Sequence, residues 1–285
     1  MTAMVDRWMS LRVAGVRWWW LVLLPVLAVL GAVNVIAVAG LINAALHQSV
    51  PNDWVQFKMA AERISGGVSP YTIDPPWTFR WSPVAAWILL PLTAVGPIPW
   101  MVAQFASLLA LPRRIALMAL LTVPFWADVY EGNILTFAFV LAVLALKGSR
   151  LASLAYIGLA ILVPRPLMVP VAVWLLWKRP DVRIPTAAIF AVHGVLVVLT
   201  GYGGQWLQRL ATSGDEIAMH NAGPSALIGP WWIPIGLALA GVFTWRGRLG
   251  LASLAASPYL ILYYWIFGLL EFVQLASNSS TANSR

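Results

Sequence analysis

The stretch EGNILTFAFVLAVLAL at residues 131–146 is apolar almost without interruption after its acidic first residue. A continuous apolar run is typical of a membrane helix, whereas the strands of a membrane β-barrel alternate between apolar and polar residues. Similar runs recur near residues 18–46, 81–96, 98–112, 114–128, 151–178, 184–200, 230–245 and 251–272. The pattern therefore predicts an all-α, polytopic helical membrane protein.

The composition agrees with this fold class. Of the 285 residues, 61% are hydrophobic and only 10% are charged, against roughly a quarter in an ordinary soluble domain. So little charge cannot cover a water-exposed surface, which excludes a soluble globular enzyme and a disordered chain. The absence of Cys excludes disulfides and Cys-based zinc sites. The three histidines show no metal-ligand spacing, so we expect no metal and no cofactor.

The net charge of +8 does not indicate nucleic-acid binding. The eighteen Lys and Arg residues stand in ones and twos between the apolar runs, which is how positive charge controls membrane topology. Arg7, Arg12 and Arg17 precede the first run and predict a cytoplasmic N-terminus. We therefore expect a multi-pass protein of the plasma (inner) membrane that has membrane lipid, and no nucleic acid, as a partner.

Two longer polar stretches, at about residues 47–80 and 201–229, separate the runs. We expect nine spans, or ten if residues 151–178 are broken at Pro164-Arg165-Pro166. If residues 81–112 then act as one bent crossing, the broken arrangement has six crossings between the two loops, as the unbroken one has. Either arrangement leaves an even number of crossings between the two loops, so both loops lie on the outer face. Residues 1–275 would form a single transmembrane domain, followed by a disordered tail at 276–285.

The first loop contains a segment with helical periodicity, from Asp53 to Ile64. Its apolar residues, Trp54 and Phe57 among them, fall largely on one face. We expect a short amphipathic helix that lies on the membrane surface. The pair at residues 66–67, Gly-Gly, is expected to end it.

Acidic residues are rare, and their positions suggest candidate functional groups. Seven of the ten lie in three stretches between spans: Asp53, Glu62, Asp74, Asp128, Glu131, Asp215 and Glu216. Acids beside apolar spans are costly, so each is a functional hypothesis by default. Asp53 is either a first-turn cap of the loop helix or a general base at the membrane surface. For Glu62, Asp74 and the pair at 215–216 we favour ordinary solvated or turn positions.

Two arginines are also candidates. Arg80, in FRWSP, is either an interfacial cation between Trp77 and Trp81 or a phosphate ligand, a role that suits the geometry of a guanidinium. Arg165 stands between two prolines inside an apolar stretch. It marks either a short loop, or a water-filled cavity or lipid head-group, since the carbonyls that the prolines release need partners other than lipid.

These residues occur in an order that resembles a known family. Asp53, a helix, GGVSPY at 66–71 and FRWSPVAAWILLPL at 79–92 resemble polyprenyl-phosphate-mannose-dependent mannosyltransferases of glycosyltransferase family 87, in the GT-C superfamily. EGN at 131–133 is similar to the family's G-Q-x-N stretch without the Gln. ILVPRPLMVP at 161–170 resembles its K-P-x-P stretch, with Arg165 in place of Lys. HNAGPSALIG at 220–229 resembles an N-x-S segment.

The resemblance implies a membrane glycosyltransferase of the cell envelope with its active site on the outer face. It would move a sugar, mannose by the resemblance, from a polyprenyl-phosphate donor to a hydroxyl of a lipid or glycan acceptor, with inversion. Asp53 would be the catalytic base and no metal would be required. The other implied site residues are Arg80 and Arg165 for the donor phosphate, and Tyr71, Asn133, His220 and Asn221 for substrate.

Two other functions stay open at this point. A carrier or flippase for lipid-linked sugars would need polar residues running through its spans, whereas the span interiors here are nearly empty of charge. A degenerate, non-catalytic membrane relative would keep the fold but tolerate replacement of its loop acids without loss of function.

Overall fold

The computed structural model describes residues 12–13, 16–17, 39, 52–72, 78–212, 221 and 223–273. The expected first span, near residues 18–46, lies outside these residues except for residue 39. The predicted tail and the candidates Asp74, Asp215, Glu216 and His220 also lie outside them.

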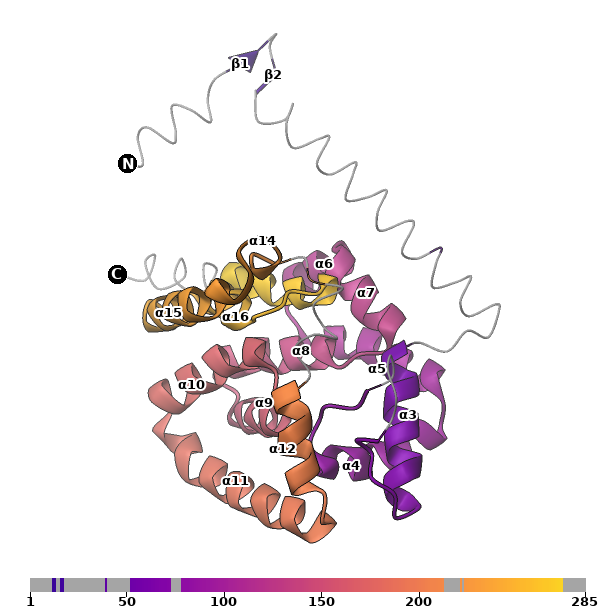
Figure 1. Cartoon of the computed structure of the whole chain (residues 1–285). Helices are drawn as coiled ribbons and strands as arrows, with labels where there is room; N and C mark the ends of the chain where they lie inside the picture. The colour runs from indigo at the N-terminus through magenta and orange to yellow at the C-terminus, as the bar shows by residue number, and fades with distance from the viewer. Residues whose placement is uncertain are drawn as a thin grey trace.

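The described residues form thirteen α-helices, four 3-10 helices and one pair of two-residue strands (Figure 1). The all-α fold class is therefore confirmed for this part of the chain. The antiparallel strands are β1 (Arg12–Val13) and β2 (Val16–Arg17). The helices are α3 (Asn52–Ser65), α4 (Pro83–Ala94), α5 (Pro97–Ser107), η1 (Leu108–Ala110), α6 (Arg113–Leu120), α7 (Val123–Glu131), α8 (Leu135–Leu146), α9 (Arg150–Leu162), η2 (Pro166–Met168), α10 (Val169–Lys178), α11 (Pro180–Thr200), α12 (Gly203–Thr212), α14 (Ser225–Ile228), η3 (Gly229–Trp231), α15 (Trp232–Trp245), α16 (Leu249–Ala256) and η4 (Leu262–Leu269).

Two helices among the described residues are long and apolar enough to cross a membrane. They are α11 and the continuous segment Ser225–Trp245, each 21 residues long, close to the roughly 20 residues that a straight span needs. A third candidate is the pair α4 and α5–η1, which is bent by 103° at its break. The other apolar helices are shorter: Leu135–Leu146, Arg150–Leu162, Pro166–Lys178 and Leu262–Val273.

Breaks occur where proline and glycine interrupt the apolar runs. Residues 151–178 form two separate helices, α9 and α10, joined by η2 after Pro164. Gly96 has a positive φ of 86° and precedes Pro97, so α4 and α5 meet at a sharp bend. The structure thus has both the broken 151–178 segment and the bent 81–112 segment of the second arrangement. The expected span near 251–272 is also divided, into α16 and η4.

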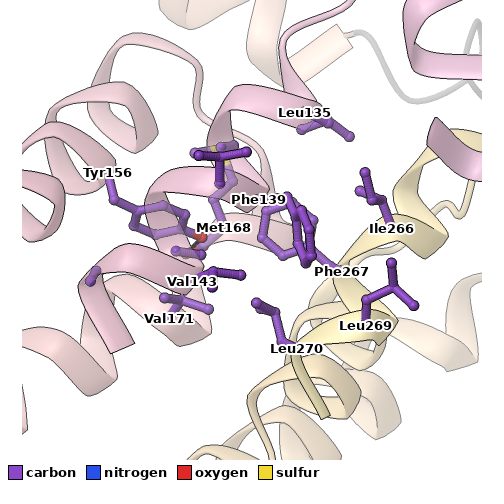
Figure 2. Close-up of a cluster of buried hydrophobic side chains, with 14 of the residues drawn as sticks. Leu135, Phe139, Val143, Tyr156, Met168, Val171, Ile266, Phe267, Leu269 and Leu270 are labelled. Atoms are coloured by element: carbon purple, nitrogen blue, oxygen red, sulfur yellow. Dashed lines mark hydrogen bonds between the residues drawn. The ribbon is translucent and has the colours of Figure 1, made fainter. Parts of the chain in front are cut away.

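The centre of the fold is an apolar core between α8, α9, α10 and η4. Phe139 and Val143 of α8 meet Phe267 and Leu270 from the η4 region, with Tyr156 of α9 beside them (Figure 2). The Tyr156 hydroxyl donates to the carbonyl of Met168 at 3.0 Å, so the polar end of this buried ring is satisfied. This core fixes α8 and η4 relative to the proline break, and so fixes the elements that carry the site below.

The predicted loop helix is confirmed as α3. It ends at the Gly66-Gly67 pair, where Gly67 has a positive φ of 73°. Its apolar face, with Trp54 and Phe57, packs against α4 and the aromatic residues beside it; the rings of Phe57 and Trp81 are 4.2 Å apart. Protein therefore covers the face that we expected to lie on the membrane surface, which corrects that expectation.

The two polar loops contact each other directly. The Tyr202 hydroxyl donates to the Gly67 carbonyl at 2.8 Å, and the Trp206 indole donates to the Arg80 carbonyl at 3.2 Å. The Ser69 hydroxyl also donates to the side-chain carbonyl of Gln205. Both loops therefore lie at the same end of the molecule, as their placement on one membrane face requires.

Candidate functional site

A cavity of about 440 Å³ lies where the two loops meet the helical body. Its walls come from α3, residues 78–81, the proline break at 164–166, the end of α12 and the segment 257–264. Asp53, Arg80 and Arg165 all line it. The structure therefore brings the candidate base and both candidate phosphate ligands into one space, although they come from three separate parts of the chain.

Asp53 stands in the first turn of α3, but its carboxylate contacts side chains from elsewhere. The Asn133 side-chain amide donates to its Oδ2, and the Tyr263 hydroxyl lies 3.5 Å from the same oxygen. Asn133 comes from the turn between α7 and α8, and Tyr263 from η4. Asp53 therefore both lies in the first turn of α3 and lines the cavity.

Burial raises the pKa of Asp53 above its ordinary value, because water no longer solvates the charged form. The positive charge of Arg165, the hydrogen bonds from Asn133 and Tyr263 and the charge of Arg80 act in the opposite direction. The net shift is upward. A carboxyl group shifted toward neutral pH is a better general base than an ordinary surface aspartate.

Arg165 extends from the break between α9 and α10 into the cavity. Its Nη1 donates to the Tyr264 hydroxyl at 3.1 Å, and its guanidinium carbon lies 5.3 Å from the ring centre of Tyr264 and 5.9 Å from that of Tyr263. Pro166 has no N–H to donate to the carbonyl of Leu162, four residues before it. That carbonyl accepts instead from the Ser82 N–H at 2.9 Å. The guanidinium thus lies against the two tyrosine rings of the cavity wall.

Arg80 lines the same cavity from the segment that precedes α4. Its Nη2 donates to the Thr78 hydroxyl at 3.2 Å, while its carbonyl accepts from Trp206 of α12. A single residue therefore presents a charge to the cavity and ties the second loop to the first. This position is compatible with the phosphate-ligand interpretation that the sequence left open.

Two of the residues implied as substrate-binding, Tyr71 and Asn221, lie outside the lining of the cavity. Tyr71 is buried behind the cavity wall, and its hydroxyl donates to the Trp81 carbonyl at 2.8 Å. Asn221 accepts from the N–H groups of Gly223 and Leu260, at 2.9 and 3.0 Å, and donates to the Ser225 hydroxyl. Neither lines the cavity; Asn221 anchors the segment that forms one of its walls.

Sequence reasoning missed Tyr263 and Tyr264, which complete the wall around Asp53 and Arg165. They lie in the apolar stretch LYYWIFGLL, where tyrosine suggests only an aromatic belt. The available signal was that a buried tyrosine hydroxyl requires a polar partner. In the part of the chain that the structure describes, no group of three His, Cys, Asp or Glu side chains is placed to hold a metal ion.

Comparison of the chain with known protein families, with curated protein sequences and with solved structures finds no match. The arrangement of Asp53, Asn133, Arg80 and Arg165 is therefore the basis for assigning a function.

Proposed function

We propose that this protein is a membrane glycosyltransferase of the GT-C type, which moves a sugar from a polyprenyl-phosphate donor to an acceptor hydroxyl. The observation that carries the proposal is the cavity in which Asp53 meets Arg80 and Arg165. A transfer from a phosphate leaving group needs one base for the acceptor and cations for the departing anion. The resemblance to family 87 adds mannose as the sugar and a lipid or glycan as the acceptor.

The reaction is a single displacement. The acceptor oxygen forms a bond to the anomeric carbon from the face opposite the phosphate, while the bond from that carbon to the phosphate oxygen breaks. Asp53 takes the proton of the acceptor hydroxyl, and the lipid phosphate leaves with the bonding electron pair. Arg80 and Arg165 stabilise the negative charge that develops on the phosphate. Displacement from one face inverts the anomeric centre.

We further propose the full topology that the sequence predicts: nine or ten spans in the plasma membrane, a cytoplasmic N-terminus and the site on the outer face. The contact between the two loops supports a shared face. Because the chain has no Cys, single cysteines at Val68 and Asp215 can be labelled with an impermeant thiol reagent. Both should react from outside, and reaction from opposite sides would overturn the topology.

The deciding experiment for the activity is Asp53→Asn. Membranes that contain the full chain are incubated with radiolabelled polyprenyl-phosphate mannose, and product is measured for wild type and variant. Removal of a general base typically lowers the rate by about 10²–10⁴-fold. Asn is nearly isosteric and is also a good helix cap, so thermal stability should stay unchanged.

The matched control is Glu62→Gln, an exposed acid on the same helix, where it pairs with Lys58. It should transfer the sugar at the wild-type rate. Near wild-type transfer by Asp53→Asn would reduce Asp53 to a cap. Movement of the lipid-linked sugar across the membrane without transfer would favour a carrier, and binding without either would favour a non-catalytic relative.

A further inference from the structure

One buried carboxylate lies close to the site but has no part in the proposed displacement. We propose that Asp128 is a positioning residue: through Gln104 and the backbone of Asn133, it holds the Asn133 amide against the carboxylate of Asp53. The inference rests on the proposed function in one respect, which is that Asp53 acts as the general base. The contacts themselves form a continuous chain from Asp128 to the cavity.

The first part of this series of hydrogen bonds surrounds Asp128, whose side chain is 0% exposed. Its Oδ2 accepts from the Thr136 N–H at 2.7 Å and from Gln104 Nε2 at 3.0 Å, and its Oδ1 accepts from the Leu135 N–H at 3.3 Å. The two backbone donors belong to the start of α8. A carboxylate is expensive to bury, and the N–H groups of Leu135, Thr136 and Gln104 fix its orientation here.

The second part fixes the backbone of Asn133 from both sides. Gln104 Nε2, which Asp128 orients, also donates to the Asn133 carbonyl at 2.7 Å, and the Trp100 indole donates to the same oxygen at 3.2 Å. The Asn133 N–H donates in turn to the Asp128 carbonyl at 3.0 Å. Asp128 therefore contacts Asn133 directly through its main chain and indirectly through its side chain.

The third part orients the side chain of Asn133. Its Oδ1 accepts from the Ile134 N–H at 2.6 Å, so its Nδ2 is directed to Asp53 Oδ2. A flipped amide would turn Nδ2 toward the Ile134 N–H and leave two donors facing each other. Asp128 thus orients Asp53 through two residues, Gln104 and Asn133. Position matters for a general base, because it must lie within about 2.6–3.2 Å of the proton donor.

Other groups also face Asp53 and influence its titration. Arg80 precedes α4, Arg165 lies at the proline break, Tyr263 comes from η4, and Asn133 lies in the turn before α8. A test of Asp128 must leave all four in place. Substitutions at Asp128 and Gln104 do so, because neither residue lines the cavity.

The test follows the protonation of Asp53 itself by infrared titration of the purified full chain, with its band assigned by its loss in Asp53→Asn. In Asp128→Asn the Asn133 donor should loosen, and the titration midpoint of Asp53 should rise by about one pH unit, because a hydrogen bond to a charged group contributes about tenfold or more. Loss of a nearby negative charge would act oppositely and lower the midpoint. The sign therefore separates positioning from a charge effect.

Two further variants sharpen the result. Gln104→Leu removes the link without changing charge, and it leaves both backbone bonds of Asp128 intact, so it serves if Asp128→Asn fails to fold. It should raise the midpoint in the same way. In an Asn133→Ala background, Gln104→Leu should add no further rise, because the donor that it positions is already gone.

The matched control is Glu271→Gln. Glu271 also accepts from a backbone N–H in the first turn of a helix, that of Leu251 at 3.0 Å, and it pairs with Arg248. It should leave the Asp53 midpoint unchanged. An unchanged or lowered midpoint in Asp128→Asn and an unchanged one in Gln104→Leu would overturn the inference. If the midpoints rise as expected but wild type transfers no sugar, positioning stands and the proposed function fails.

Discussion

The helices of the two polar loops differ in what they bury. On α3, Trp54 is 1% exposed and Phe57 is 2% exposed, because both pack into the aromatic cluster beside α4. On α12 no side chain is buried, and Leu207 is 63% exposed. Yet both helices line the same cavity, α3 with Asp53 and α12 with Leu210 and Ala211.

This difference shows that one site is built from two kinds of support. Side-chain packing holds α3, so the position of Asp53 follows from the apolar core of the first loop. Hydrogen bonds near the start of the helix, to Ser69 and to the Arg80 carbonyl, hold α12, and its only contact with the aromatic cluster among its described side chains is the half-buried ring of Trp206. An amphipathic sequence alone does not distinguish the two cases, since the apolar face of α3 is buried in protein whereas Leu207 of α12 is exposed.

The largest effect should come from removing the packing of α3. Trp54→Ala should lower the free energy of unfolding by about 3–5 kcal/mol, because it deletes a large, fully buried ring, one that also packs against Trp100 at 5.7 Å. The measurement is chemical or thermal unfolding in detergent. Leu207→Ala is the matched truncation on α12 and should stay within about 0.5 kcal/mol of wild type. Equal losses would mean that α12 packs as tightly as α3.

The burial of α3 also predicts how pH affects the protein. A base works in its ionised form, so transfer should rise by up to about tenfold per pH unit until the pH exceeds the raised pKa of Asp53. Stability should change in the other direction. The folded state holds the Asp53 proton more tightly than the unfolded state, because the pKa is raised on folding. The stability that Asp53 contributes is therefore fully present below the ordinary pKa of 3.8 and is lost as the pH rises through the raised pKa.

Transfer rates and unfolding midpoints measured over the same pH series check both directions. Glu62→Gln should leave both profiles unchanged, because that acid is exposed. Transfer that falls with rising pH would contradict the assignment of Asp53 as a base.

The smallest effect should come from the hydrogen bond that ties α12 to the first loop. Ser69→Ala and Gln205→Ala should each cost about 0.5–1.5 kcal/mol, and the double variant should cost little more than Ser69→Ala, which also removes the acceptor of the Tyr71 N–H. A double-mutant cycle on unfolding free energies measures this coupling. Fully additive losses would show that the Ser69–Gln205 bond contributes nothing to holding α12.

Local features of the fold could be predicted because they depend on local physics. The helix α3 and its glycine stop follow from periodicity, and the break at Pro164 and Pro166 follows from the missing N–H groups of proline. The candidates Asp53, Arg80 and Arg165 could be chosen because charge beside apolar spans is costly. The structure adds that they share a cavity.

The rest depends on contacts between residues far apart in the chain. Nothing near Tyr263 indicates that its hydroxyl faces Asp53, and nothing in GNIL indicates that Asn133 is held by Gln104. Tyr71 and Asn221 were assigned by motif, but the Tyr71 hydroxyl donates to the Trp81 carbonyl, and Asn221 accepts from two main-chain N–H groups and donates to the Ser225 hydroxyl. Polar residues in a motif thus identify the region of a site more reliably than the direction in which each side chain points.

The separation of Asp53 and Tyr263 by 210 residues has a consequence for biosynthesis. A chain is synthesised from its N-terminus, and contacts between distant residues form late because closing a long loop is entropically costly. When α3 emerges from the ribosome, the wall that surrounds its acid has not yet been translated. The contact between Asp53 and Tyr263 can therefore form only after η4 has been translated, so the site is completed long after α3 has been made.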